Sequence, residues 1–184
     1  APYVERIVEL TGPTSVVYCE NSCLNALFRY YDAYASERGV KLVVSAVCGG
    51  ISLHDADLTV LVSNLLENAT TASVEAAAAF SKSGRSGVEV PVIDVVAGVV
   101  GGNFALQVTN PCVGVQLAPD VPKDRWQEFL PASAFVSTHE GGGRGMRRID
   151  DIVDAYHGHA SFRFDDAEGR FVSRLTLPCE GMSS

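Results

Sequence analysis

Apolar side chains recur at helical spacing in two stretches of the chain, which predicts two helices. The first is expected over residues 20–38, because Gly39 follows and glycine commonly ends helices. The second is longer and is expected to begin at Ser52 or Asp55, either of which can cap it, and to end near Phe80. The apolar positions are Leu24, Leu27, Phe28, Tyr31 and Tyr34 in the first pattern and Leu58, Leu61, Val62, Leu65, Leu66 and Ala69 in the second.

Short valine-rich or alternating segments between glycines predict the strands. Two pairs of such segments flank the turn residues 101–103 and 166–169, which is the pattern of a β-hairpin. Between the hairpins lies a segment interrupted by prolines, with a short helical patch near Trp126, followed by a helix expected over 144–156. The expected strands are 40–48, 88–100, 104–109, 161–165 and 170–177.

The predicted order is helix, strand, long helix, hairpin, irregular segment, helix and hairpin, with no internal repeat. Mixed strands with helices segregated from them are typical of an α+β protein. We therefore expect a two-layer α/β sandwich, in which one face of a mixed, mainly antiparallel sheet is covered by helices.

Composition and charge narrow the classes of function. The chain has 184 residues, 47% of them hydrophobic, and a net charge of −8. The apolar content excludes wholesale disorder, and the acidic balance argues against a protein that binds nucleic acid. No apolar run is long enough to span a membrane. The cysteines are odd in number and scattered, which is typical of reduced thiols rather than a zinc site: Cys19, Cys23, Cys48, Cys112 and Cys179.

A polar stripe runs along the long predicted helix. At about 100° per residue, Asp57, Asn64, Asn68 and Thr71 fall on one face. Carboxamide oxygens are hard ligands for magnesium, and carboxamide hydrogens can donate to phosphate. The alternative interpretation is the solvent-facing side of an ordinary amphipathic helix.

Two further segments combine glycine with polar groups. In residues 140–149, glycines precede a helix, so backbone amides and the helix N-terminus can approach an anion, and Arg144, Arg147 and Arg148 add positive charge. The segment is neither a Walker loop nor a Rossmann turn, and the alternative is a flexible hinge. In residues 108–114, Asn110 places a polar side chain at the end of a predicted strand. The alternative is an ordinary turn from a strand into a loop, which Asn-Pro also marks.

Taken together, these segments resemble the motifs of the ATP-binding catalytic domain of sensor histidine kinases, in the Bergerat (GHKL) superfamily. The likeness is greatest to kinases of peptide quorum-sensing systems. Asn64–Ala69, with the sequence NLLENA, matches the asparagine box of that family. Asn110–Gly114 stands where the first glycine box belongs, and Gly143–Met146 matches the second. The resemblance covers about residues 18–178.

The resemblance implies roles for individual residues. It implies that ATP and Mg²⁺ bind, that Asn68 helps to coordinate the metal, and that Asn110 contacts the adenine amino group. Residues 115–140 would form a lid over the nucleotide. The implied catalytic residues are Asn64, Glu67 and Asn68. The implied nucleotide-binding residues are Asn64, Asn68, Asn110, Gly114, Gly143, Arg144, Gly145 and Met146.

The chain departs from the family pattern at two positions of the first glycine box. Asn110 stands where the family has aspartate, so the contact to adenine loses charge assistance. Cys112 stands in place of the middle glycine.

The resemblance predicts the catalytic domain of a two-component sensor histidine kinase, which transfers the γ-phosphoryl group of Mg-ATP to a histidine upstream of this chain. Residues 1–17 would end a helical dimerisation segment, and 18–184 would form the catalytic domain. The expected partners are those upstream dimerisation and phosphoacceptor helices and a response regulator. Attachment to a bacterial membrane would come through upstream segments only, which makes this part cytoplasmic. The alternatives are a degenerate, non-catalytic interaction module and a related ATPase.

Overall fold

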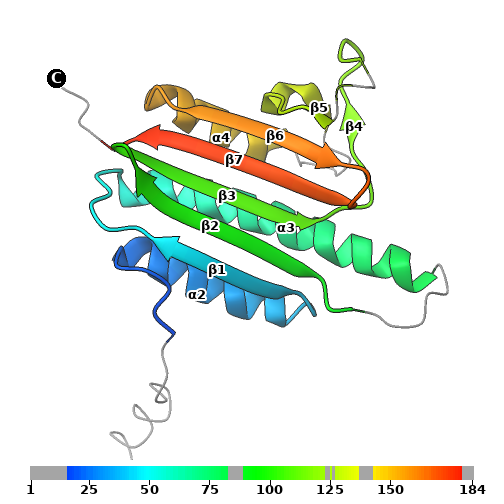
Figure 1. The fold of residues 1–184 in the computed structure, drawn as a ribbon, viewed down its shortest axis with the longest axis horizontal. Coiled ribbons are helices and arrows are strands. Elements are labelled where there is room, and N and C mark those ends of the chain that lie inside the picture. The colour runs from blue at the N-terminus through cyan, green and yellow to red at the C-terminus, as the bar shows by residue number, and fades with distance from the viewer. Residues whose placement is uncertain (1–15, 83–88, 123–124, 126, 137–142, 180–184) are drawn as a thin grey trace, which may run out of the picture.

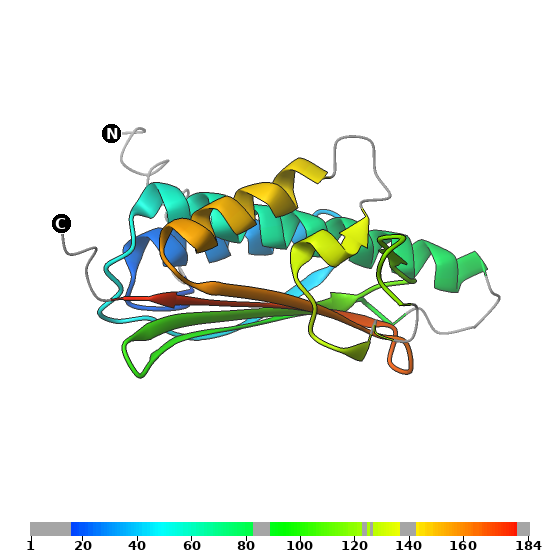
Figure 2. The ribbon, with the colours of Figure 1, turned by 90° about the horizontal axis from the view of Figure 1, so that it is seen from above.

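The protein forms two layers, a five-stranded sheet and a layer of helices on one of its faces (Figures 1 and 2). This computed structural model describes residues 16–82, 89–122, 125, 127–136 and 143–179. The strand order is β1-β2-β3-β7-β6, with β1 parallel to β2 and every other neighbouring pair antiparallel. The predicted two-layer α+β sandwich with a mainly antiparallel sheet is confirmed.

The elements follow the predicted order. The helices are α2 (Ser22–Ser36), α3 (Asp55–Lys82) and α4 (Gly143–Ala155). The strands of the sheet are β1 (Lys41–Val47), β2 (Val92–Val100), β3 (Asn103–Pro111), β6 (His159–Asp165) and β7 (Arg170–Pro178). A separate small ladder pairs β4 (Gln116–Leu117) with β5 (Phe135–Val136), next to the 3-10 turn η2 (Ala132–Ala134). None of the helices in the described ranges has the length and apolar character needed to cross a membrane.

The core lies between the sheet and the helices, and β3 shows how the sequence builds it. Alternate residues of a strand face opposite sides of a sheet, so Phe104, Leu106 and Val108 all point toward the helices and are buried. The next residue in this series is Asn110, which is 2% exposed. A polar side chain therefore occupies the last helix-facing position of β3.

Several boundaries differ from the prediction for identifiable reasons. Helix α2 begins at Ser22 rather than at residue 20, because the Asn21 side chain accepts a hydrogen bond from the Leu24 N–H at 2.9 Å and caps the helix. Strand β6 begins two residues earlier than expected, at His159, which pairs with Thr176 of β7. The two-residue ladder of β4 and β5 was not predicted, since so short a strand has no periodicity. The predicted patch at Trp126 lies outside the described residues.

Three tyrosine hydroxyls tie the helical layer together by donating to carboxylates. Tyr31 of α2 donates to Glu67 Oε1 of α3 at 2.9 Å, and Tyr156 at the end of α4 donates to Asp57 Oδ2 of α3 at 2.7 Å. Tyr18 donates to Asp32 Oδ2 at 2.8 Å, which holds the segment before α2 against that helix. Burial is the main cause that raises the pKa of Tyr31 to about 12.

We expect stability to fall as the pH rises from about 10 toward about 12. The pKa of Tyr31 in the folded state lies above its ordinary value of 10.0, so over this window the folded state binds more protons than the unfolded state. The stabilisation from Tyr31 is complete at pH values below its ordinary pKa of 10.0. It is lost as the pH rises above that value, by about 1.4 kcal/mol for each unit by which the pKa in the folded state exceeds the pKa in the unfolded state. Urea unfolding of the native chain and of Tyr31→Phe, between pH 9 and 11.5, measures this loss.

The Tyr31→Phe variant should be less stable at pH 7 by about 1 kcal/mol, because it loses one hydrogen bond, and its free energy of unfolding should fall less steeply with pH. Tyr30→Phe is the matched control, since Tyr30 is the next residue of α2 and is 61% exposed. Equal pH slopes in the native chain and in Tyr31→Phe would contradict the prediction.

Gly158, in the turn from α4 to β6, is expected to tolerate no larger side chain. A Cβ there would lie 2.5 Å from both the Thr176 carbonyl oxygen and Leu177 Cδ2 of β7. The backbone oxygen cannot move without disturbing the sheet, so Gly158→Ala should destabilise the fold by about 1–3 kcal/mol. Gly49→Ala is the control, because a Cβ at Gly49 meets no atom within 4 Å. Thermal unfolding of the two variants tests this, and equal melting temperatures would refute it.

Candidate functional site

Helix α4 crosses the polar stripe of α3 and covers its first half. At the C-terminal end of the crossing, the hydroxyl of Tyr156 binds Asp57 and also accepts a hydrogen bond from the His54 N–H at 3.3 Å. At the N-terminal end, α4 meets Asn64, which is half-buried. The next stripe residues, Asn68 and Thr71, are exposed. The crossing therefore leaves the second half of the stripe open, beginning beside the N-terminus of α4.

Asn64 and Gly145 are in close contact, so the predicted asparagine box and second glycine box meet. Asn64 Nδ2 donates to the Val60 carbonyl oxygen at 2.7 Å, which fixes the orientation of the amide. A Cβ on Gly145 would lie 2.7 Å from Asn64 Oδ1. Glycine at this position lets α4 come this close without displacing the Asn64 carboxamide, and the contact brings the N-terminal turn of α4 to the asparagine stripe.

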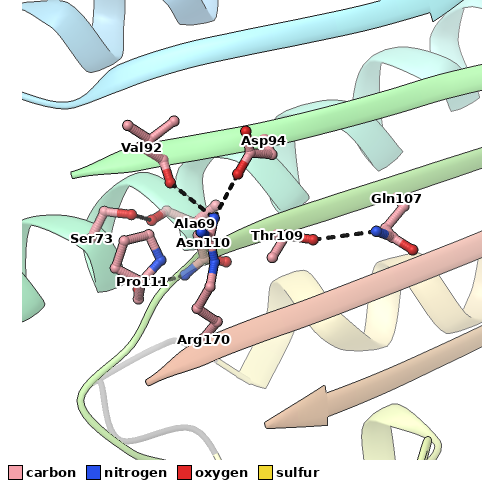
Figure 3. A network of polar contacts seen from close by, with 9 residues as sticks. All are labelled: Ala69, Ser73, Val92, Asp94, Gln107, Thr109, Asn110, Pro111 and Arg170. Carbon is pink, nitrogen blue, oxygen red and sulfur yellow. Dashed lines mark hydrogen bonds and ion pairs between the residues drawn. The ribbon is translucent and has the colours of Figure 1, made fainter. Parts of the chain in front are cut away.

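Asn110 lies at the end of β3, over the part of α3 that carries Ala69 and Ser73 (Figure 3). Its Nδ2 donates to the carbonyl oxygen of Pro111 at 2.8 Å. The hydroxyl of Ser73, also buried, donates to the Ala69 carbonyl oxygen at 2.7 Å within α3. The carboxamide of Asn110 is thus held by the backbone of the next residue, which limits the cost of burying it.

The end of β3 is braced from two other directions. On the sheet face away from the helices, Arg170 of β7 forms an ion pair with Asp94 of β2 at 2.6 Å and also donates to the Val92 carbonyl oxygen at 3.4 Å (Figure 3). At the turn after β6, the Gly169 carbonyl oxygen accepts from the Cys112 N–H at 2.8 Å. The residues just after Asn110 therefore leave the sheet at a well-defined point.

A cavity of about 350 Å³ lies between α3 and the segment that follows β3. It is lined by Ala72, Glu75, Cys112, Val113, Gly114, Val115 and Gln116. The thiol of Cys112 donates to the Gly114 carbonyl oxygen at 3.1 Å. Burial raises the pKa of this thiol, and the negative charge of Glu75 raises it further, so the group remains protonated at neutral pH.

The structure gathers some of the predicted site residues and leaves others apart. Asn64 and Gly145 are in contact, and Gly114 lines the cavity. The side chain of Glu67 is directed to α2, where it accepts from Tyr31, and a role for it in catalysis stays a prediction.

The second glycine box, Gly143–Met146, forms the first turn of α4. Met146 is half-buried against the core. Residues 123–124, 126 and 137–140 of the predicted lid, and the glycines at 141 and 142, lie outside the described residues.

Sequence reasoning missed the two cavity residues contributed by α3, Ala72 and Glu75. The sequence did contain a signal for Glu75, which follows Asn68 by seven residues. Residues seven apart in a helix point in directions that differ by only about 20°, so Glu75 lies on the same face as Asn68. Continuing the polar stripe by two turns would have found it. Ala72 carries no such signal, because an alanine in a helix looks the same whether it faces a core or a cavity.

The fold is that of histidine kinase catalytic domains. The mycobacterial sensor histidine kinase MprB aligns with a TM-score of 0.57 and 15% identity, over 86% of this chain and 96% of that one. The catalytic domain of histidine kinase ThkA aligns with a TM-score of 0.55 and 17% identity, over 85% of this chain and 92% of that one. Full-length ShkA in complex with AMPPNP aligns with a TM-score of 0.54 and 13% identity, over 88% of this chain and 30% of ShkA.

Comparison by sequence adds nothing to this result. No family model matches the chain, and a search of curated proteins finds no match. The similarity therefore lies in the fold, and function has to be argued from the site.

The contact between Asn64 and Gly145 predicts an energetic coupling between the two motifs. In an Asn64→Ala background, Gly145→Ala should stabilise the chain by up to about 1 kcal/mol, because alanine favours helix over glycine. With Asn64 present, the new Cβ displaces the carboxamide, so this gain should shrink by about 0.5 kcal/mol or more. Urea unfolding of the four proteins in this cycle measures the difference, and an equal effect of Gly145→Ala in both backgrounds would rule the coupling out.

Proposed function

We propose that this chain is the ATP-binding catalytic domain of a two-component sensor histidine kinase. The observation that carries the proposal is the contact of Asn64 with Gly145, which brings the N-terminal turn of α4 to α3 one helical turn before the exposed Asn68. A helix N-terminus presents unpaired N–H groups and a positive dipole, and an adjacent carboxamide can serve either phosphate or metal. The fold of histidine kinase catalytic domains, and the nucleotide analogue bound to ShkA, support this assignment.

The residues present fit Mg²⁺ together with a nucleotide. Magnesium keeps several water ligands and takes the rest from phosphates and one or two protein oxygens, so a single exposed carboxamide such as Asn68 is a suitable donor. When bound, the ion would neutralise charge on the β- and γ-phosphates. Asn64 would line the part of the site that holds the phosphates. The N-terminus of α4 would face the same phosphates, and it is formed by Gly143, Arg144, Gly145 and Met146.

The base would enter the cavity between α3 and residues 112–116, beside Asn110 and with Gly114 in its lining. Phosphoryl transfer depends mainly on positioning and charge neutralisation, so the chain would hold Mg-ATP while a histidine from the upstream helices attacks. The proposed partners are those upstream helices and a response regulator. Attachment to a bacterial membrane would come through upstream segments. Residues 1–17 would belong to the upstream segment and residues 18–184 to the catalytic domain.

A non-catalytic module with the same fold is the second candidate, and Asn110 is the observation that favours it. This neutral side chain stands where the family carries a carboxylate, and its Nδ2 is already bound to Pro111. If this weakened base recognition enough to abolish nucleotide binding, the domain would signal through protein contacts alone.

Asn68→Ala should weaken magnesium-dependent ATP binding about tenfold to a hundredfold, the effect of losing one strong polar contact. The melting temperature should change little, because Asn68 is exposed and the structure gives its side chain no hydrogen bond within the described residues. Calorimetric titration of ATP, with and without magnesium, measures the affinity.

Val74→Ala is the control for this experiment, since Val74 is an exposed position of α3 that lies off the polar stripe. It should bind ATP like the native chain. If a folded Asn68→Ala variant also bound Mg-ATP with native affinity, the assignment of Asn68 would be wrong. If the native chain bound no nucleotide at millimolar concentration, the non-catalytic module would replace the kinase.

A further inference from the structure

The two edge strands of the sheet, β6 and β1, differ in how they are protected. The backbone of Leu130 pairs with Phe162 of β6, through hydrogen bonds of 2.8 Å in both directions. Charged side chains lie on β6 as well, where Arg163 and Asp165 form an ion pair. Covering and charge are common ways to keep an edge strand from pairing with another chain. By contrast β1, at the opposite edge of the sheet (Figure 1), carries no charged side chain after its first residue, Lys41.

The backbone of β1 offers a row of open hydrogen-bonding groups. The Lys41 N–H donates to the Pro91 carbonyl oxygen at 2.9 Å, at the start of the parallel ladder with β2. Alternate residues of a strand direct their N–H and C=O groups to opposite sides, so those of Leu42, Val44 and Ala46 point away from β2. Within the part of the chain that the structure describes, these groups have no hydrogen-bond partner. The edge of β1 can therefore accept a further strand.

The side chains of β1 are arranged so that the strand complements a second copy of itself. Val43 and Val47 are 38% and 71% exposed, and Ser45 lies midway between them on the same face. In an antiparallel pair centred on Ser45, Val43 of each copy lies opposite Val47 of the other, and cross-strand pairs of β-branched residues stabilise a sheet. The same register sets Val44 opposite Ala46, so these residues exchange their open N–H and C=O groups.

The charges at the two ends of the β1 edge also favour a second copy. The Cys48 N–H, just after β1, donates to Glu20 Oε2 at 3.1 Å, which places a carboxylate at this end of the edge. Lys41 begins the strand at the other end and is exposed. Antiparallel partners run in opposite directions, so Glu20 of each copy comes to the end that carries Lys41 of the other. Complementary charges of this kind select the partner and the register.

We propose that the β1 edge is a self-association surface, to which β1 of a second copy of this chain adds in the antiparallel direction and joins the two sheets. Helix α2 packs on β1, whereas α4 packs on β6 and β7 at the other side of the sheet. The pairing therefore leaves α4 and the open part of the α3 stripe accessible. It goes beyond the proposed function, because it is separate from the proposed upstream dimerisation helices and needs no nucleotide.

Sedimentation equilibrium of the 184-residue chain tests the association, and Ser45→Lys tests its register. The native chain should show a reversible equilibrium between monomer and dimer. Ser45→Lys sets two like charges directly opposite each other at the centre of the pair, so it should weaken the dimer about tenfold or more. Ser45 is exposed, so the fold should be unaffected. Thr176→Lys is the matched control, because Thr176 is an exposed residue on the same face of β7, three strands away from β1, and it should leave the dimer unchanged.

Ser45→Cys shows where the two copies meet. The proposed register makes Ser45 and its counterpart a non-hydrogen-bonded pair, in which the Cα atoms lie about 4.5 Å apart, within the range that a disulfide can bridge. Oxidised glutathione should therefore trap a covalent dimer of Ser45→Cys. Thr176→Cys, treated in the same way, should stay monomeric on a non-reducing gel.

Two results would overturn the proposal. One is a native chain that stays monomeric up to about 1 mM, which would leave a strand of another protein as the partner of the β1 edge. The other is a dimer that Ser45→Lys does not weaken and Ser45→Cys does not cross-link, because the two copies would then meet at another surface. Neither result changes the expected binding of Mg-ATP, so the proposed function stands or falls by its own titration.

Discussion

The packing of α4 across α3 is the constraint on which the arrangement of the site depends. It is held at two points of the same stripe, by the hydrogen bond from Tyr156 to Asp57 at one end and by the close approach of Gly145 to Asn64 at the other. Together these contacts decide where the covered part of the stripe ends. A shift of α4 by one turn along α3 would either bury Asn68 or separate the helix N-terminus from it.

The second wall of the site is built by strand alternation. The pattern that places Phe104, Leu106 and Val108 in the core also places Asn110 at a buried position, where an apolar residue would cost less. Its hydrogen bond to the Pro111 carbonyl oxygen offsets part of that cost. The ion pair of Arg170 with Asp94 holds the opposite face of the sheet at the same level. Buried polar groups in native proteins are hydrogen-bonded as a rule, and Asn110 meets that requirement through the backbone of the next residue.

The parts that the sequence predicted are those with a period or a characteristic turn residue. Helical spacing placed Asn64 and Asn68 on one face, and alternation and glycines placed the strands and hairpins. The cavity had no such signal, because the segment that closes it, residues 112–116, has no regular pattern, and its position depends on the Gly169 contact with Cys112. The direction of Glu67 was predictable, since it is rotated by about 100° from Asn68, toward α2. The length of β6 was not, because pairing with β7 decided it.

Similarity of fold at 11–18% identity leaves the chemistry of the site open, so charge has to decide what can bind there. The chain is acidic overall, and most of its surface would repel a polyphosphate. At the start of α4 the local charge is positive instead, because Arg147 and Arg148 are exposed there and the N-terminal end of the helix dipole is positive. Two turns further along α3 the sign changes again at Glu75. Of the described parts of α3 and α4, the start of α4 is therefore the one whose charge favours an anion.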